Sequence, residues 1–243
     1  MRMFTFSQRC AREILRDPLN ILFGLGFPLV LLLLLSAIQA NVPVALFEIR
    51  HLTPGITVFG LSFLTLFSAT LIARDRETAF LQRLYTTPLK PADYILGYLL
   101  PMIPIAILQS AACYLTAIPL GLPVHGNILL ALFALIPIAV FYISLGLLCG
   151  SVLNIKQVGG ICGALLTNLS AWLSGVWFDL ELVGPVFQKI AKALPFVHAV
   201  ELERAVIRGN WAEGFPHLLP VLIYAALVTV LAVWLFLRQM HQQ

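Results

Sequence analysis

The sequence predicts an all-α integral membrane protein whose 243 residues form a single transmembrane domain, 1–243. Hydrophobic residues make up 60% of the chain and charged residues only 11%. Because soluble domains carry roughly 25% charged residues, this chain lacks the polar groups to cover a water-exposed surface. Its apolar stretches are long and unbroken, whereas the strands of a membrane β-barrel alternate over about ten residues. The fold is therefore expected to be helical.

A membrane-spanning helix requires about 20 predominantly apolar residues, and six stretches meet this requirement. None of the six contains Asp, Glu, Lys or Arg. We predict spans at approximately 19–38, 53–73, 95–118, 128–153, 158–178 and 216–237. Counted along the sequence, ten Lys and Arg residues then fall on the side of the N-terminus and five on the other side. Since basic residues accumulate on the cytoplasmic side, we expect both termini in the cytoplasm.

The segment before the first span, 1–17, is expected to be an amphipathic helix lying on the inner membrane surface. Spacings of seven, three and four residues place four arginines on one helical stripe: Arg2, Arg9, Arg12 and Arg16. Apolar residues fall largely on another stripe. Pro18 allows a sharp turn into the span, because proline is tolerated at a helix start. A basic tail without regular structure is the alternative.

The segment 74–93, between the second and third spans, is charged and lies on the cytoplasmic side. Its apolar residues include Phe80, Leu81 and Leu84, and its polar residues are Arg76, Glu77, Gln82 and Arg83. A short helix of this kind at the membrane face suits contact with another protein. A solvated connector explains the pattern equally well.

The loop 179–215, before the last span, is too long for a simple turn. Its apolar residues recur at helical spacings, which predicts one or two short helices that dip into or lie on the outer leaflet. These helices would partly cover the outer mouth of the region that the spans enclose.

Several kinds of chemistry are missing. No lysine follows a glycine, so the chain has no phosphate-binding P-loop. Neither a zinc-binding H-E-x-x-H nor a G-x-S-x-G nucleophile motif occurs. The four cysteines form no C-x-x-C pair, and the five histidines have no ligand spacing. We therefore expect no enzyme activity, no metal and no cofactor in this chain. The small basic excess fits membrane orientation, and we expect no nucleic acid as a partner.

Spans without ionisable residues disfavour an ion-coupled carrier, which keeps such residues inside the bilayer. What remains is a pathway moved by something outside the chain. Polar residues in the spans could line that pathway or bond neighbouring helices: Gln109, Tyr142, Ser144, Asn168 and Ser170. Gly159, Gly160 and Gly163 are expected to permit close helix approach.

Three segments, in order, resemble the type-2 ABC exporter permeases (the transmembrane subunits of ABC-2 type transporters). The first is Arg12-Glu13-Ile14-Leu15-Arg16-Asp17-Pro18 before a leucine-rich span. The second runs from Arg74-Asp75-Arg76-Glu77 to Leu81-Gln82-Arg83-Leu84-Tyr85-Thr86-Thr87-Pro88-Leu89. The third is Leu194-Pro195-Phe196-Val197-His198-Ala199-Val200, followed by Arg204-Ala205-Val206. The family usually has an acidic residue, Gly and Thr after the Glu, where this chain has Thr78-Ala79-Phe80.

The resemblance implies a permease that pairs with a second permease chain, as a homodimer or heterodimer, and with two ABC ATPase subunits that bind ATP and Mg²⁺. It implies that ATPase contacts come from the N-terminal helix and the segment after the second span: Arg9, Arg12, Arg16, Arg76, Glu77, Phe80, Leu81, Arg83 and Leu84. It also implies a re-entrant outer gate that includes Phe187, Pro195, Phe196 and His198.

The leading hypothesis is therefore the permease subunit of an ATP-driven exporter in the bacterial cytoplasmic (inner) membrane. Its cargo would be amphipathic, lipid-like, a drug or a glycan, and the sequence leaves this choice open. Two alternatives come from other classes. One is a membrane anchor or sensor subunit for a soluble partner, and the other is an ion-coupled secondary carrier.

Overall fold

The computed structural model describes residues 2–42, 44–78 and 91–240, and all regular structure in these ranges is helical. The predicted all-α class is confirmed. Within these ranges, five helical segments are long and apolar enough to cross a membrane: Pro18–Asn41, Ile49–Glu77, Asp93–Ala117, Asn127–Val152 and Trp211–Arg238.

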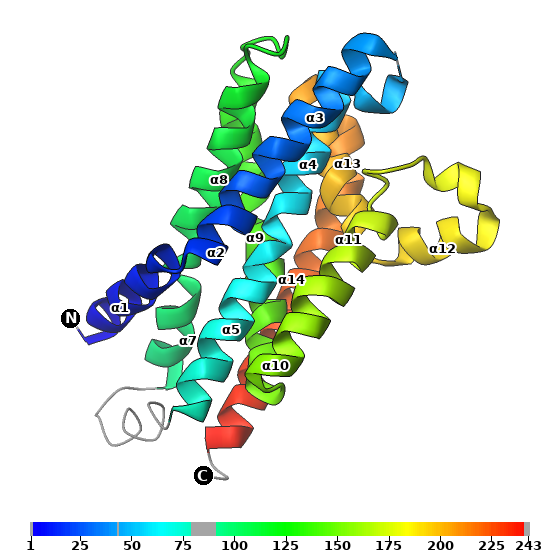
Figure 1. The fold of residues 1–243 in the computed structure, drawn as a ribbon. Coiled ribbons are helices and arrows are strands. Elements are labelled where there is room, and N and C mark those ends of the chain that lie inside the picture. The colour runs from blue at the N-terminus through cyan, green and yellow to red at the C-terminus, as the bar shows by residue number, and fades with distance from the viewer. Residues whose placement is uncertain (1, 43, 79–90, 241–243) are drawn as a thin grey trace.

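The first half of the chain forms α1 (Arg2–Arg16), which we call the surface helix, and three of these segments (Figure 1). Its elements are α1 (Arg2–Arg16), α2 (Pro18–Ile21), η1 (Leu22–Gly26), α3 (Phe27–Asn41), η2 (Ala45–Phe47), α4 (Ile49–Leu61), α5 (Phe63–Glu77), α7 (Pro91–Leu99) and α8 (Met102–Ala117). The second half contains α9 (Asn127–Val152), α10 (Ile155–Val158), η3 (Gly159–Leu166), α11 (Thr167–Leu173), η4 (Leu180–Val183), α12 (Pro185–Ala193), α13 (Pro195–Arg208) and α14 (Trp211–Met240).

The sixth predicted span, 158–178, is not among the five segments. The structure places α10, η3 and α11 there, and helix ends at Leu173. The π-helical η3 occupies the middle, and polar Lys156, Gln157 and Asn168 lie within this run of helix. The run lies beside α5 in the bundle (Figure 1). Its crossing of the membrane stays a prediction.

The α4–α5 segment is the centre of the bundle. In its most apolar window 89% of residues are buried, against 17% for Pro18–Asn41. Two hydroxyls of α5 face α9. Thr65 Oγ1 donates to the Tyr142 carbonyl oxygen at 2.9 Å. Ser68 Oγ lies 2.7 Å from the Leu64 carbonyl oxygen of its own helix and 3.2 Å from the Ile143 carbonyl oxygen of α9. These bonds satisfy the hydroxyls in apolar surroundings, where an unpaired polar group is costly. The central span is therefore fixed to α9.

Close packing of α5 on α9 depends on two glycines of α9. A Cβ at Gly146 would overlap Ser68 and lie 2.5 Å from the Thr65 carbonyl oxygen. A Cβ at Gly150 would lie 2.7 Å from the Ala69 carbonyl oxygen. Small residues allow helices to approach closely in a membrane. The prediction that Gly159 and Gly160 permit close helix approach was wrong within this chain, because a Cβ at either position meets no atom within 4 Å. Gly163, the third predicted glycine, does face α5, where a Cβ would lie 3.4 Å from the Leu66 side chain.

Beyond α11, the chain forms η4 and α12, which project from the side of the bundle, and α13, which returns into it (Figure 1). Arg204 of α13 holds this return in place. Its guanidinium donates to the carbonyls of His51 and Gly175 and pairs with Glu201 at 2.7 Å. The segment 179–215 thus contains η4, two α-helices (α12 and α13) and the first turn of α14. Of these, α13 packs against α4, α9 and α14.

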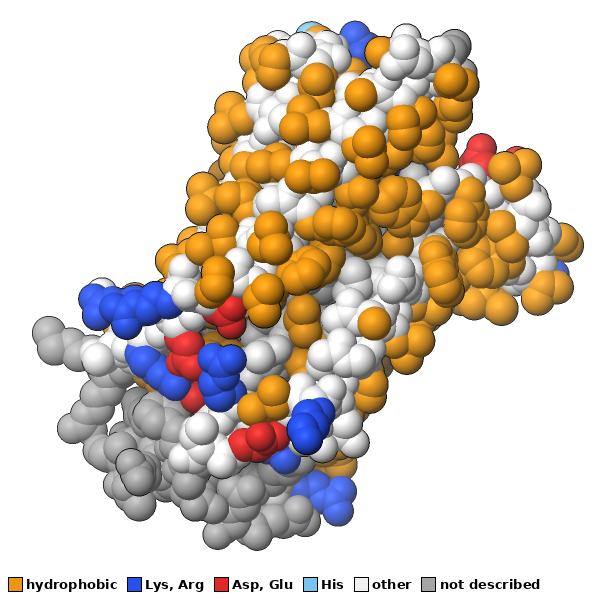
Figure 2. All heavy atoms as spheres, in the orientation of Figure 1, with side chains coloured by type: hydrophobic (Ala, Val, Ile, Leu, Met, Phe, Trp, Pro, Cys, Tyr) orange, Lys and Arg blue, Asp and Glu red, His pale blue; other side chains and the backbone are white. Residues whose placement is uncertain are grey.

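Helix α1 and the last turns of α14 lie at the same end of the bundle (Figure 1). We call this the basic end: α1, the C-terminal end of α5, the N-terminal end of α10 and the C-terminal end of α14. Figure 2 shows Lys, Arg, Asp and Glu side chains gathered there below a broad hydrophobic band. Arg50, at the start of α4, lies at the opposite end.

Candidate functional site

Helix α1 is held against the bundle by an aromatic contact. The ring of Phe6 meets Tyr98 edge-on with centroids 5.0 Å apart, and Tyr94 edge-on at 6.2 Å. Gly97 lies between these tyrosines, and a Cβ there would overlap Phe6. Cys10 packs one turn further along and is fully buried, and burial raises the pKa of its thiol to about 12. The apolar stripe of α1 therefore faces α7.

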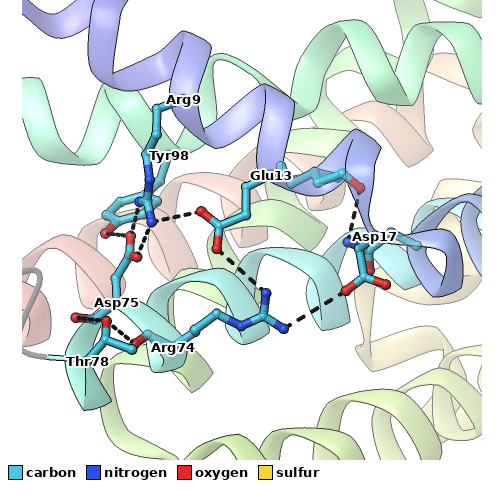
Figure 3. A network of polar contacts seen from close by, with 9 residues as sticks. Arg9, Glu13, Asp17, Arg74, Asp75, Thr78 and Tyr98 are labelled. Carbon is cyan, nitrogen blue, oxygen red and sulfur yellow. Dashed lines mark hydrogen bonds and ion pairs between the residues drawn. The ribbon is translucent and has the colours of Figure 1, made fainter.

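The next contact joins α1 to the central span through charge (Figure 3). The Arg9 guanidinium donates two hydrogen bonds to the Asp75 carboxylate, at 2.6 and 2.7 Å. The hydroxyl of Tyr98 donates to Asp75 Oδ2 at 2.8 Å. Asp75 is 1% exposed. A buried carboxylate needs such partners, because an unpaired charge there is strongly destabilising. Arg9 thus ties the surface helix to the end of α5.

A second set of ion pairs runs along the outer side of this junction. Glu13 pairs with Arg9 at 2.7 Å and with Arg74 at 3.6 Å, and Arg74 approaches Asp17 at 3.9 Å. Asp17 also caps α2, because its side chain accepts from the Leu19 backbone N–H at 3.0 Å. Figure 3 shows Glu13 between the two arginines. The turn from α1 into the first span is therefore anchored to α5.

The last residues of α5 are tied to the turn between α9 and α10. Arg76 donates to the carbonyl oxygens of Gly150 and Leu153, at 2.8 and 3.3 Å. The Glu77 carboxylate accepts from the Ile155 backbone N–H at 2.9 Å, at the first position of α10. A cation at a helix C-terminus and an anion at a helix N-terminus both complement the helix dipole. One end of α5 therefore contacts α1, α7, α9 and α10, and we call this set of contacts the α5 junction.

The residues predicted to contact an ATPase fall into three groups. Arg9, Arg76 and Glu77 belong to the α5 junction. Arg12 and Arg16 are exposed and form no ion pair with any described residue. The remaining four lie outside the described residues: Phe80, Leu81, Arg83 and Leu84. Their contact with a partner stays a prediction in every case.

Most residues proposed for the pathway bond neighbouring groups inside the chain. The hydroxyls of Tyr142 and Ser170 lie 2.5 Å apart, and those of Ser144 and Thr229 2.7 Å apart. The side-chain amide of Gln109 lies 3.4 Å from the Thr57 carbonyl oxygen. Asn168 is exposed and donates to the Ala164 carbonyl oxygen of its own helical segment at 2.8 Å. Of these five residues, Tyr142 and Ser170 are in contact with each other, and the pathway role of all five stays a prediction.

The residues proposed for the outer gate lie on α12 and α13. Phe187 of α12 contacts Phe178, with ring centroids 6.3 Å apart. Pro195 begins α13, and Phe196 is buried against Phe141. The ring of His198 reaches α14, where its Nδ1 lies 2.8 Å from Nδ1 of His217. Their action as a gate stays a prediction.

Sequence reasoning missed two buried carboxylates. Asp75 follows the predicted span 53–73 by two residues, but the helix continues to Glu77. Glu203 lies on the buried face of α13, is 0% exposed, and accepts from the Tyr114 hydroxyl at 2.5 Å. Its Oε2 has no hydrogen-bond partner among the described residues. The apolar neighbours Val200, Leu202 and Val206 were the signal that this helix face is buried. No cluster of three metal-binding side chains occurs in the part of the chain that the structure describes.

Comparison with known proteins gives one family over most of the chain. A family model described as ABC-2 type transporter matches residues 1–207. Two proteins named nodulation protein J are similar over 227 residues, which cover 93% of this chain and 85% of each relative: 24% identical in Sinorhizobium fredii and 25% in Bradyrhizobium diazoefficiens. A protein of Porphyra purpurea named as a transport permease, ycf38, is 38% identical over 87 residues, 34% of this chain and 30% of that protein.

Proposed function

Because the chain belongs to the ABC-2 type transporter family, we propose that it is the membrane-spanning permease subunit of an ATP-driven exporter. The chain is a multi-pass membrane protein, and one of its relatives is named as a transport permease. Family membership implies an ABC ATPase as partner. We propose that ATP and Mg²⁺ are bound and ATP is hydrolysed in that separate subunit, and that this chain has no enzyme activity of its own.

The observation that carries this proposal is the α5 junction. A conformational signal needs contiguous packed or hydrogen-bonded groups to travel through a protein. The Arg9–Asp75 pair connects α1 to the central span, and Arg76 connects that span to α9. An ATPase that moves α1 or the chain after Glu77 would therefore move the buried α4–α5 segment and α9 together.

The proposed orientation places the basic end in the cytoplasm of a bacterial cell, with both termini there. The chain then belongs to the cytoplasmic membrane, where ATP is available on one side only. The ten-to-five distribution of basic residues supports this choice. Helix α1, with Arg9, Arg12 and Arg16, would lie at the level of the lipid headgroups.

The working unit would contain two permease chains and two ATPase subunits, and it would move an amphipathic, lipid-like, drug or glycan cargo outward. A second permease copy is supported by the single chain, because four of its five polar span residues bond other groups inside the chain and the fifth, Asn168, is exposed. A route between two chains would then be lined by surfaces that are exposed in one. We propose α12 and α13 as the outer cover of that route.

Co-purification tests the proposal. The tagged chain is solubilised in a mild detergent from its native membrane, its partners are identified, and ATPase activity is assayed. We expect an ATPase subunit with the wild-type chain and its loss with the double variant Glu77→Ala, Arg83→Ala. Arg50→Ala is the matched control at the opposite end and should retain the ATPase. Recovery of no ATPase in several detergents would contradict the proposal.

A further inference from the structure

Two cavities adjoin the turn between α1 and α2, and they differ in character. A polar cavity of about 560 Å³ is lined by Arg9, Arg12, Glu13, Arg16, Asp17 and Arg74. An apolar cavity of about 230 Å³ lies between α1, η1, α5 and α8. Neighbouring residues of α1 line both cavities: Glu13 and Arg16 line the first, and Ile14 and Leu15 the second.

The polar cavity carries a net positive charge. Its lining holds four arginines and two carboxylates, and one of the arginines, Arg9, also pairs with the Asp75 carboxylate behind it, which leaves a net charge of +1. Glu13 is engaged by Arg9 and Arg74, and Asp17 by Arg74. Arg12 and Arg16 are one helical turn apart, exposed, and without an ion-pair partner among the described residues. Two free guanidinium groups at this spacing can bind the oxygens of one phosphate.

The apolar cavity is lined almost entirely by apolar groups. Apart from Asn20 and Gln109, its lining consists of apolar side chains and Gly24. The Asn20 amide donates to the Ile14 carbonyl oxygen at 3.3 Å, and that of Gln109 faces the Thr57 carbonyl oxygen at 3.4 Å. Such a cavity suits a hydrocarbon chain.

We propose that the α1–α2 turn binds one anionic phospholipid of the adjacent leaflet, with its phosphate at Arg12 and Arg16 and part of one acyl chain in the apolar cavity. Basic pockets between membrane helices bind anionic headgroups, and α1 leads directly into the first membrane segment at Pro18. This inference goes beyond the proposed exporter function, because binding of a lipid at this site requires a membrane but no ATPase. The site would hold α1 at the bilayer surface while Arg9 holds it to Asp75.

Native mass spectrometry of the purified chain tests this site with phosphatidylglycerol and, as the zwitterionic control, phosphatidylcholine of the same acyl chains. We expect preferential binding of one phosphatidylglycerol. In the double variant Arg12→Gln, Arg16→Gln the affinity should fall about 30-fold, because two basic contacts to an anionic lipid are lost. The matched variant Lys156→Gln, Arg238→Gln changes two basic residues at the same end and outside the cavity, and it should bind as the wild type does.

The apolar half is tested separately. Leu108→Trp places an indole at the apolar cavity, whereas Leu115→Trp changes another exposed leucine of α8 outside it. We expect the first to weaken phosphatidylglycerol binding and the second to leave it unchanged. Equal binding of both lipids, or equal competition by inorganic phosphate alone, would overturn the proposal. So would a double arginine variant that loses the ATPase but keeps the lipid, since these arginines would then serve the partner protein.

Discussion

The Arg9 guanidinium forms two hydrogen bonds with the Asp75 carboxylate and so joins a surface helix to the most buried segment of the bundle. Asp75 is 1% exposed, whereas the Arg9 side chain is 35% exposed. The carboxylate therefore depends on the arginine more than the arginine depends on the carboxylate. Because the buried Asp75 belongs to α5 and the more exposed Arg9 to α1, we expect a movement of α1 to displace the end of α5.

Replacing Arg9 should destabilise the fold, because Asp75 loses its only charged partner among the described residues. We expect Arg9→Met to lower the free energy of unfolding by about 2 kcal/mol, less than for a fully buried pair because water reaches Arg9. The measurement is denaturant unfolding in detergent. Arg12→Met is the control and should change little. A double variant Arg9→Met, Asp75→Asn should recover part of the loss, and a loss equal to that of Arg9→Met alone would contradict this account.

Cys10 reports whether α1 is docked. It is fully buried, and burial raises its thiol pKa to about 12, so at pH 7.5 the reactive thiolate is scarce. In a variant that keeps only Cys10, we expect slow maleimide labelling. Phe6→Ala should accelerate it at least tenfold, because the contact with Tyr94 and Tyr98 is lost. Phe4 is 70% exposed, so Phe4→Ala should leave the rate unchanged. Fast labelling of the parent variant would argue against a docked α1.

The glycines of α9 should be intolerant of substitution. Gly146→Ala places a methyl group against Ser68 and the Thr65 carbonyl oxygen, and we expect a loss of about 1–3 kcal/mol in stability. Gly160→Ala has open space around it and serves as the control. Thermal unfolding of both variants in the same detergent gives the comparison. Equal melting temperatures would show that α5 and α9 do not approach as closely as described.

The Tyr114–Glu203 bond should matter for stability although neither residue lies at the α5 junction. Tyr114→Phe leaves the buried Glu203 carboxyl without its only hydrogen bond among the described residues. We expect a cost of about 1–3 kcal/mol, measured by thermal unfolding. Glu203→Met in the Tyr114→Phe background tests the cause, since it removes the unpaired polar group and should restore part of the stability. Tyr224→Phe, which removes an exposed hydroxyl contact, should cost less.

The sequence was sufficient for the helical class and for the approximate location of five membrane segments, because long apolar runs reflect a local requirement of the bilayer. The sixth predicted stretch, 158–178, stays a prediction. The helical run in this region begins at Ile155 and ends at Leu173, so it includes the polar Lys156 and Gln157 and omits the last residues of the predicted stretch. Helix ends also depend on neighbours. The central helix continues beyond residue 73 because Arg9 and Tyr98 compensate the buried Asp75.

The candidate site was harder to predict for the same reason. The basic stripe of α1 was visible in the sequence, but its division of roles was not. Arg9 pairs inward with Asp75, whereas Arg12 and Arg16 stay exposed. Arg9 differs from Arg12 and Arg16 because its partner, Asp75, lies 66 positions away along the chain. A pattern within the first helix cannot reveal such a partner. Similarly, the choice between Gly146 and Gly159 as the packing glycine is decided by which face of each helix meets α5.

The central claim, that the basic end of this chain binds an ATPase subunit, is tested most directly by site-specific crosslinking. A photoreactive amino acid is placed at Thr78, exposed at the end of α5, or at Val124, which is 70% exposed at the opposite end. Membranes are irradiated and the crosslinked partners identified. The account predicts an ATPase subunit crosslinked from position 78 and none from position 124. An ATPase crosslinked only from position 124, or from neither position, would contradict it.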